Sequence, residues 1–361
     1  MRAAVLRATD RPFEIEEIHL GELRPDEVLV RVVASGMCHT DLIMRNPALA
    51  AGFRPIILGH EGSGVVEAVG NAVTQTKPGD HVALSFDACG WCRSCLAGNP
   101  AYCVQFEVRN VTGARADGTL SAVDQAGADV ANRWFGQSSF AEYAIATERN
   151  IVVVPDDVPL EVVGPLGCGL QTGAGSVFNA MRLRPGQSLA VLGAGAVGLA
   201  AVMAAKIAGA RDIVVVDLHE SRLALAEELG ATRTIRGDAE DLASAIRNGA
   251  DGVDFSFETT SVTALIGTAI AVLRRPGKAV LVGAGAGRLD IHPSALTGRT
   301  VTFALEGGAI PQLLLPRLIE EWRAGRFPFE KLITTYPLAA VNQAEADSIS
   351  GKTVKPVLLM N

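Results

Sequence analysis

Short apolar runs alternate with longer, partly polar segments through the second half of the chain. The runs SLAVL, DIVVVD, FSFET and AVLVGA have the length and the β-branched content of buried strands. The segments between them include ESRLALAEEL and SVTALIGTAIAVL, which are typical of helices. Strands that alternate with helices predict a parallel sheet. Nearer the N-terminus, the period-two spacing of Val28, Val30 and Val32 predicts a further strand.

The longest uncharged apolar stretch, Leu189–Ala205, is nearly long enough to span a bilayer. Its glycines at positions 193, 195 and 198 directly follow an apolar run, so a strand, a tight turn and an alanine-rich helix to about Ala208 explain it better. The N-terminal stretch contains three charged residues between positions 7 and 11 and lacks the apolar core of a signal peptide. We therefore expect a cytoplasmic protein with no membrane partner.

Length and charge narrow the class of protein further. At roughly 100–200 residues per domain, 361 residues correspond to two or three domains. The 32 Lys+Arg and 39 Asp+Glu residues leave a net charge of −7 without a block of like charges, which disfavours nucleic acid as a partner. The 38 glycines follow no period, so a collagen-like or low-complexity chain is excluded.

Four of the six cysteines lie within fifteen residues, in the order Cys89-x2-Cys92-x2-Cys95-x7-Cys103. A disulfide framework suits short secreted chains, whereas four crowded thiolates can surround a zinc ion at about 2.3 Å. All four positions of the tetrahedron would be filled by protein, so the spacing predicts a structural zinc site. The alternative is a group of buried thiols without a metal.

The other two cysteines, Cys38 and Cys168, are far apart in sequence, and His60 lies between them. Together they would give zinc three protein ligands and one open position, which is the arrangement of a catalytic site. Each residue alone has a simpler interpretation, as a hydrogen-bonded core histidine or a buried free cysteine. The glycines around His60 favour the metal site, because glycine permits close approach of the backbone.

The glycine-rich segment Gly193-Ala194-Gly195-Ala196-Val197-Gly198 lies between the predicted strand SLAVL and the alanine-rich helix. Its glycines allow a tight turn and close approach to a pyrophosphate at the helix N-terminus. Nineteen residues after Gly198, Asp217 ends the next strand and can accept hydrogen bonds from an adenosine ribose. That carboxylate favours NAD over NADP, although Arg222 nearby could serve either cofactor.

These motifs together resemble the zinc-dependent medium-chain alcohol dehydrogenases over essentially the whole chain. The resemblance rests on Gly59-His60-Glu61 with Gly64 and Gly70, on the four-cysteine loop, and on GAGAVG with Asp217. Residues 134–144 (WFGQSSFAEYA) and 164–180 (GPLGCGLQTGAGSVFNA), with Glu306-Gly307-Gly308, resemble the aryl (benzyl) alcohol dehydrogenase branch, which also contains geraniol dehydrogenases.

The resemblance implies an α/β protein of two domains. A GroES-like β-barrel catalytic domain would comprise residues 1–167 and 306–361, and a Rossmann doubly wound parallel sheet would comprise residues 168–305. It also implies two zinc ions per chain, one catalytic and one structural, NAD as cofactor, a small alcohol or aldehyde as substrate, and a homodimer or homotetramer.

The resemblance also implies roles for single residues. Cys38, His60 and Cys168 would bind the catalytic zinc, with Glu61 behind it as a transient replacement ligand. Asp41 would orient His60, and Thr40 would take the alcohol proton; the alternative for these two is a pair that stabilises a turn. The implied cofactor contacts are His39, Thr172, Gly193, Gly195, Val197, Gly198, Asp217, Arg222 and Lys355.

The chain departs from many relatives in its proton relay and leaves its substrate open. Ile43 stands where those enzymes have a histidine, so we expect the proton to leave through water or another group. Candidate pocket regions are Ser85-Phe86, residues 44–54, Phe106, Leu120, Phe140 and the turn at Glu306. They include apolar and aromatic groups that suit a benzylic or allylic primary alcohol better than ethanol or a polyol. The alternatives are a glutathione-dependent formaldehyde dehydrogenase, another medium-chain alcohol dehydrogenase, or a non-catalytic zinc and nucleotide protein.

Overall fold

The computed structural model describes residues 1–46, 54–283 and 287–360. The chain forms two compact units. The first comprises Met1–Cys168, Ile310–Ile319 and Glu330–Asn361, and the second comprises Gly169–Ala309 and Glu320–Phe329. The residues of helix α10 (Pro311–Arg323) are therefore divided between the two units.

The first unit is built on two sheets. One has the strand order β4-β1-β2-β7, and the other has the order β16-β17-β3-β5-β6-β9, with β8 paired to β3. Neighbouring strands are antiparallel in both sheets, except that β16 and β17 are parallel. The strands are β1 (Arg2–Leu6), β2 (Glu14–Leu20), β3 (Glu27–Gly36), β4 (Ile56–Ile57), β5 (Glu61–Val69), β6 (His81–Leu84), β7 (Ala122–Asp124), β8 (Tyr143–Thr147), β9 (Ile151–Val153), β16 (Ile333–Pro337) and β17 (Lys355–Leu359).

Strand β3 is central to the first unit, and its period-two pattern is the one predicted from the sequence. Val28, Val30 and Val32 are buried in the main hydrophobic core, whereas Arg31 is exposed. Short helices connect the strands: α1 (His39–Leu42), α2 (Arg93–Leu96), α3 (Phe106–Asn110), α4 (Leu160–Val163) and α11 (Val341–Ile349). Because β3 ends at Gly36, it leads the chain directly to Cys38.

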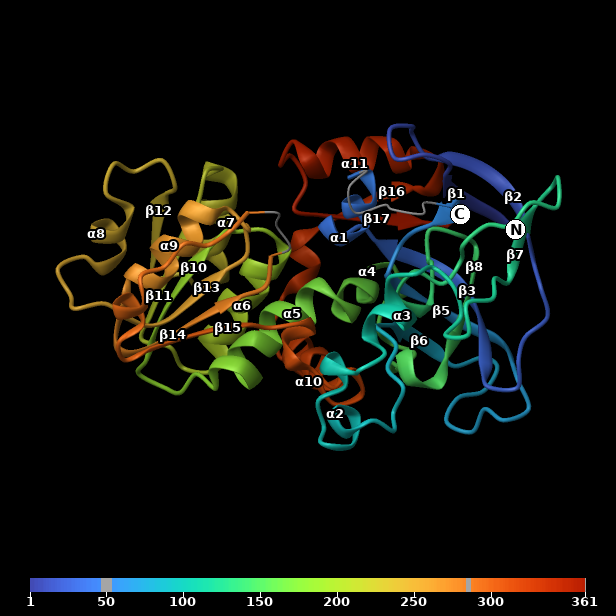
Figure 1. The fold of residues 1–361 in the computed structure, drawn as a ribbon, viewed down its shortest axis with the longest axis horizontal. Helices are drawn as coiled ribbons and strands as arrows, with labels where there is room; N and C mark the ends of the chain where they lie inside the picture. Colours follow the sequence, from blue (N-terminus) through green and yellow to red (C-terminus); the bar gives the residue numbers. More distant parts are fainter. Residues whose placement is uncertain (47–53, 284–286, 361) are drawn as a thin grey trace. The chain divides into compact units, whose positions relative to one another are not determined.

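The second unit contains a parallel sheet with the strand order β12-β11-β10-β13-β14-β15 (Figure 1). Its strands are β10 (Ser188–Leu192), β11 (Asp212–Asp217), β12 (Arg233–Arg236), β13 (Val253–Glu258), β14 (Leu273–Leu281) and β15 (Arg299–Phe303). Its helices are α5 (Gly169–Gly175), α6 (Ala196–Ile207), α7 (Glu220–Leu229), α8 (Leu242–Arg247) and α9 (Thr263–Ala271), with a π-helical turn at Ser176–Met181. The predicted strands in SLAVL, DIVVVD, FSFET and AVLVGA are confirmed.

Strand β12 was not predicted from the sequence. It lies at the edge of the sheet, and its residues RTIR are only partly buried, so it lacks the continuous apolar run of the central strands. The apolar stretch Leu189–Ala205 divides into β10, a turn and α6, as predicted. Within the described ranges, no helix combines the length and the hydropathy that a membrane span requires.

Candidate functional site

Cys38, His60 and Cys168 come together in the first unit. Cys38 follows β3, His60 lies between β4 and β5, and Cys168 follows a 3₁₀ turn at Gly164–Gly167. Their ligand atoms all lie within 4.8 Å of one another, and His60 Nε2 lies 3.1 Å from Cys168 Sγ. His60 and Cys168 are buried, whereas Cys38 is half-buried. The cluster thus joins two thiols and one imidazole from three separate segments.

The backbone at Gly59 explains how His60 reaches this cluster. Gly59 adopts a φ of +87°, which side chains other than glycine disfavour. A Cβ atom there would also collide with the ring and the backbone nitrogen of Phe140. The glycine therefore lets the chain turn tightly against Phe140 and direct the imidazole toward Cys168.

The buried Asp41 carboxylate fixes the orientation of the His60 ring. Its Oδ1 accepts hydrogen bonds from His60 Nδ1 at 2.8 Å, Trp134 Nε1 at 3.0 Å and the Gly59 amide at 3.1 Å. Its Oδ2 accepts from the Cys38 amide at 2.9 Å. With the proton on Nδ1, the lone pair of His60 Nε2 faces the thiols and is free to bind a metal.

The charges around the cluster favour the thiolate of Cys38 and positive charge at His60. The hydrogen bond with Cys168 and the positive charge of Lys355 hold the pKa of Cys38 well below its usual value despite burial. Burial alone would lower the pKa of His60, but the Asp41 carboxylate outweighs burial and raises it well above the usual value. Asp41 thus stabilises positive charge at the ring, which is also what a bound cation requires. The Cys38 thiolate is the form of cysteine that binds metals.

Lys355 and Glu61 form a buried ion pair beside the cluster. Lys355 Nζ lies 2.9 and 2.8 Å from the two carboxylate oxygens of Glu61, and it donates a third hydrogen bond to the Met37 carbonyl at 3.1 Å. Burial would lower the pKa of Lys355, but the Glu61 carboxylate raises it above its usual value. Glu61 is not among the gathered ligand atoms of the described residues; its carboxylate faces Lys355 instead.

The four cysteines of the loop at 89–103 form a second cluster, also within 4.8 Å. Cys92 Sγ and Cys95 Sγ are 3.5 Å apart, and Cys89 Sγ and Cys95 Sγ are 3.9 Å apart, so neither pair is a disulfide. The Cys92 amide donates to Cys89 Sγ at 3.3 Å, and the Cys89 amide donates to Cys103 Sγ at 3.3 Å. Backbone hydrogen bonds from Cys95 and Val104 lower the pKa of Cys92 to about 6, which favours its thiolate.

The glycine-rich segment of the second unit turns between β10 and α6. Gly193 has a φ of +101°, and a Cβ atom at Gly198 would collide with the Gly193 carbonyl, so the turn requires glycine at both positions. A Cβ atom at Gly195 would meet no other atom within 4 Å, which leaves open space beside the N-terminus of α6. The half-buried Val197 lies in the first turn of this helix. The first backbone N–H groups of α6, which have no carbonyl partner within the helix, therefore border an open space.

Asp217 lies at the carboxyl end of β11, close to this turn. Its Oδ2 accepts a hydrogen bond from the Ala194 amide at 2.7 Å, and its Oδ1 accepts from the His219 amide at 2.9 Å. The Arg222 guanidinium lies 4.0 Å from Asp217 Oδ2. Thr172 lies on α5, which packs against α6 through Gly173. The carboxylate thus lies beside the glycine turn, at the edge where parallel strands end.

The chain matches two families of known proteins. The family described as "Alcohol dehydrogenase GroES-like domain" matches residues 24–156, and "Zinc-binding dehydrogenase" matches residues 196–318. A geraniol dehydrogenase from Castellaniella defragrans is 44% identical to the chain, over 99% of the chain and 97% of the relative.

Two crystal structures resemble the whole chain. An alcohol dehydrogenase zinc-binding domain protein from Burkholderia ambifaria is 48% identical, with a TM-score of 0.97 over 100% of this chain and 98% of that one. Benzyl alcohol dehydrogenase from Acinetobacter calcoaceticus is 42% identical, with a TM-score of 0.95 over 100% and 99%. The chain belongs to the zinc-dependent medium-chain alcohol dehydrogenases. As a member of this family it is an NAD-dependent zinc enzyme with a GroES-like and a Rossmann domain.

The donor atoms of both clusters suit zinc, the metal of these alcohol dehydrogenases. With Zn–S bonds of about 2.3 Å, a tetrahedral site separates its sulfurs by roughly 3.8 Å. The sulfur distances of 3.5 and 3.9 Å in the cysteine loop bracket that separation. The Cys38 cluster offers the two-thiolate, one-imidazole donor set that leaves a fourth position open.

Other residues that the sequence suggested for the cofactor, the proton relay or the substrate pocket differ in their exposure and contacts. His39 is exposed on α1, and Thr40 Oγ1 lies 3.7 Å from Cys38 Sγ. Phe140 is fully buried and packs edge-on against Phe13, so it belongs to the core. Glu306 is buried and accepts a hydrogen bond from Gln171 Nε2 at 3.1 Å. Of the expected pocket segment at 44–54, residues 47–53 lie outside the described ranges.

Two neighbouring aromatic residues were assigned no role from the sequence, although they begin the segment that resembled the aryl branch. Trp134 donates its indole N–H to Asp41, and the ring of Phe135 stacks on His60 at a centroid distance of 4.4 Å and an interplanar angle of 27°. Phe135 has a φ of 50°, which costs a residue other than glycine on the order of 1–3 kcal/mol. The surrounding packing holds this strained conformation, and the ring covers one face of the imidazole.

A Trp134→Phe substitution tests whether the hydrogen bond from Trp134 to Asp41 contributes to metal binding at the Cys38 cluster. Removing the indole donor leaves Asp41 with one hydrogen bond fewer and loosens the orientation of His60. We expect the zinc affinity of the Cys38 cluster to fall on the order of 10- to 100-fold, since loss of such supporting partners has that effect. Competition with a chromophoric chelator measures it. Trp322→Phe, which alters a ring beside Phe329 in the second unit, is the control, and equal zinc affinities in both variants would contradict the assignment.

Proposed function

We propose that this enzyme oxidises primary aromatic or allylic alcohols, of the benzyl alcohol or geraniol type, to aldehydes, with NAD as hydride acceptor, and catalyses the reverse reduction. The observation that carries the proposal is the convergence of Cys38, His60 and Cys168 in a chain that also holds the glycine turn beside Asp217. The substrate class is supported by the two relatives named geraniol dehydrogenase and benzyl alcohol dehydrogenase.

We assign Cys38, His60 and Cys168 to hold the catalytic zinc and the loop at 89–103 to hold the structural zinc. A zinc ion held there would act as a Lewis acid and would lower the pKa of an alcohol hydroxyl. Asp41 keeps the His60 proton on Nδ1. The hydroxyl of the half-buried Thr40, 3.7 Å from Cys38 Sγ, receives the alcohol proton.

The proton leaves Thr40 by a route that does not involve residue 43. Ile43 is half-buried in a 3₁₀ turn directly after α1, and its aliphatic side chain can neither accept nor donate a proton. The exposed His39 is assigned to the cofactor rather than to the relay. We therefore propose that solvent water accepts the proton from Thr40.

Asp217 sets the preference for NAD, and its substitution tests this role. Asp217→Ser removes the carboxylate that would accept hydrogen bonds from the ribose hydroxyls and repel a 2′-phosphate. We expect kcat/KM with NAD to fall about tenfold or more. The ratio of kcat/KM with NAD to kcat/KM with NADP should therefore decrease. Asp212→Ser is the control, because Asp212 begins the same strand and is paired with Arg211. An unchanged ratio in Asp217→Ser would show that another group selects the cofactor.

Turnover of four alcohols tests the substrate class. NADH formation is followed with benzyl alcohol, geraniol, ethanol and hydroxymethyl-glutathione under the same conditions. We expect kcat/KM for benzyl alcohol or geraniol to exceed that for ethanol on the order of 100-fold, because a larger apolar group gains about 0.8 kcal/mol per buried methylene. A preference for the glutathione adduct would instead assign the enzyme to thiol-dependent formaldehyde oxidation and overturn the proposed substrate.

We further propose a cytoplasmic homodimer or homotetramer. Strand β15 lies at the edge of the parallel sheet, and its terminal Phe303 is half exposed, so this edge can pair with a second copy of the chain. A molecular mass of one chain in light scattering would contradict the oligomer.

A further inference from the structure

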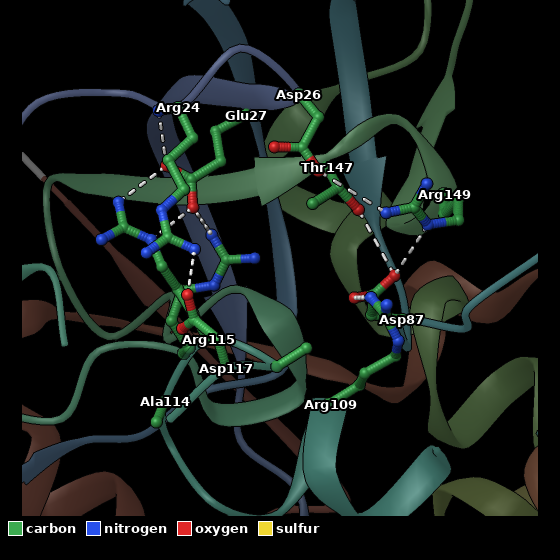
Figure 2. A pocket seen from close by; sticks show the side chains of 12 residues that line it. Arg24, Asp26, Glu27, Asp87, Arg109, Ala114, Arg115, Asp117, Thr147 and Arg149 are labelled. Atoms are coloured by element: carbon green, nitrogen blue, oxygen red, sulfur yellow. Dashed lines mark hydrogen bonds and ion pairs between the residues drawn. The ribbon is translucent and has the colours of Figure 1, made fainter. Parts of the chain in front are cut away.

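A charged pocket of about 170 Å³ lies in the first unit, apart from the Cys38 cluster (Figure 2). Five arginines and four carboxylates line it, together with Thr147 and two alanines. The charged residues are Arg24, Asp26, Glu27, Asp87, Arg109, Arg115, Asp117, Arg133 and Arg149. With every group ionised, five guanidinium charges against four carboxylates leave the wall with a net charge of 5 − 4 = +1.

Two groups of ion-paired side chains lie on opposite sides of the pocket in Figure 2. In one group, Arg115 donates to both oxygens of Glu27 at 2.7 and 2.8 Å, and Arg24 lies 2.7 Å from Asp117. In the other, Arg109 donates to Asp87 at 2.8 Å. These close pairs neutralise Glu27, Asp117 and Asp87.

Two of the arginines are incompletely paired. Arg133 is only 4% exposed; its Nε has no hydrogen-bond partner among the described residues, and its NH1 makes a long bond of 3.3 Å to Glu27, which Arg115 already occupies. Arg149 lies 3.6 Å from Asp87 and 3.8 Å from Asp26, distances of ion pairs without hydrogen bonds. A guanidinium carries five N–H donors, so both residues keep donors that the protein does not satisfy.

We propose that this pocket binds one small oxyanion of the phosphate type, held by Arg133 and Arg149. A planar guanidinium matches a phosphate or sulfate edge with two parallel hydrogen bonds. The volume holds one tetrahedral oxyanion with a few water molecules. A bound oxyanion would supply acceptors for the unsatisfied donors of Arg133 and Arg149, and its negative charge would offset the excess positive charge of the wall.

The walls of the pocket suggest what the anion would stabilise. Asp87 lies two residues before Cys89, and Arg109 lies on α3, shortly after Cys103. Glu27 begins β3, and Thr147 ends β8. A bound oxyanion would therefore join both ends of the cysteine loop to the sheet of the first unit, and it would protect that loop against local unfolding.

Calorimetric titration of inorganic phosphate into the zinc-loaded enzyme tests this site. Saturating NAD occupies the glycine turn, and sodium chloride keeps the ionic strength constant. We expect one phosphate site per chain and at least tenfold weaker binding in Arg149→Met, with sulfate behaving as phosphate does. Protease cleavage within residues 89–103 should slow when phosphate is present.

Arg31→Met is the matched control for Arg149→Met. Arg31 is half exposed on β3 and pairs loosely with Glu67 at 3.6 Å, but it does not line the pocket. The proposal would be overturned if the two variants bound phosphate equally well. It would also be overturned if the heat measured on titrating phosphate were no larger than the heat measured on titrating chloride. Arg133→Lys gives a second test, since it keeps the charge but removes the planar donor, and it should also weaken binding.

Discussion

Cys38→Ser is expected to remove one zinc per chain and to lower kcat for alcohol oxidation about a thousandfold or more. A serine hydroxyl stays protonated near neutral pH and replaces a thiolate whose pKa the surroundings hold well below its usual value. His60 and Cys168 then remain as two ligands, too few for a stable catalytic site. The metal contributes several kcal/mol to the rate, and each 1.36 kcal/mol is a factor of ten. Elemental analysis and NADH formation measure both effects.

The wild-type enzyme should contain two zinc ions per chain, and Cys38→Ser should contain one. Circular dichroism checks that the variant is folded. Two zinc ions and full turnover in Cys38→Ser would exclude Cys38 as a ligand. One zinc ion and no turnover in the wild type would mean that only the loop at 89–103 is metallated.

Cys103→Ser is expected to remove the other zinc and to destabilise the loop, while the Cys38 cluster keeps its metal. The loop has few apolar contacts of its own: Trp91 is 63% exposed, Leu96 75% and Val104 74%. Its small core consists mainly of the cysteines themselves, with Ala88 and Phe106. A loop of this kind depends on its metal for folding.

We expect the loop of Cys103→Ser to become a site of rapid proteolysis and the thermal midpoint to fall by about 5 °C or more, which corresponds to a loss of a few kcal/mol. Limited proteolysis with mass spectrometry and calorimetry measure these effects. Cys38→Ser, which alters the other cluster, serves as the control for cleavage in this loop. Unchanged protease resistance in Cys103→Ser would show that contacts other than the zinc hold the loop.

The local motifs were readable from the sequence because their chemistry depends on neighbouring residues. Cys89 to Cys103 span fifteen positions, so a short loop is enough to bring their sulfurs together. The glycine turn before α6 and the strand that ends at Asp217 are equally local, since each rests on residue types a few positions apart. The central parallel strands were predicted because burial on both faces requires a continuous apolar run, which the edge strand β12 does not need.

The Cys38 cluster depends on contacts that no local pattern contains. His60 and Cys168 are 108 positions apart, and from spacing alone a core histidine and a free buried cysteine remained the simpler interpretations. The resemblance to a family, not the spacing, joined them. The hydrogen bond from Trp134 to Asp41 spans 93 positions, and the Lys355–Glu61 pair spans 294. The sequence by itself thus determined the four-cysteine loop, the glycine turn and the central strands. Only the tertiary structure decided which side chains hold His60. Strand pairing and burial bring segments together that are far apart in the sequence, and the hydrophobic pattern of one segment contains no information about such contacts.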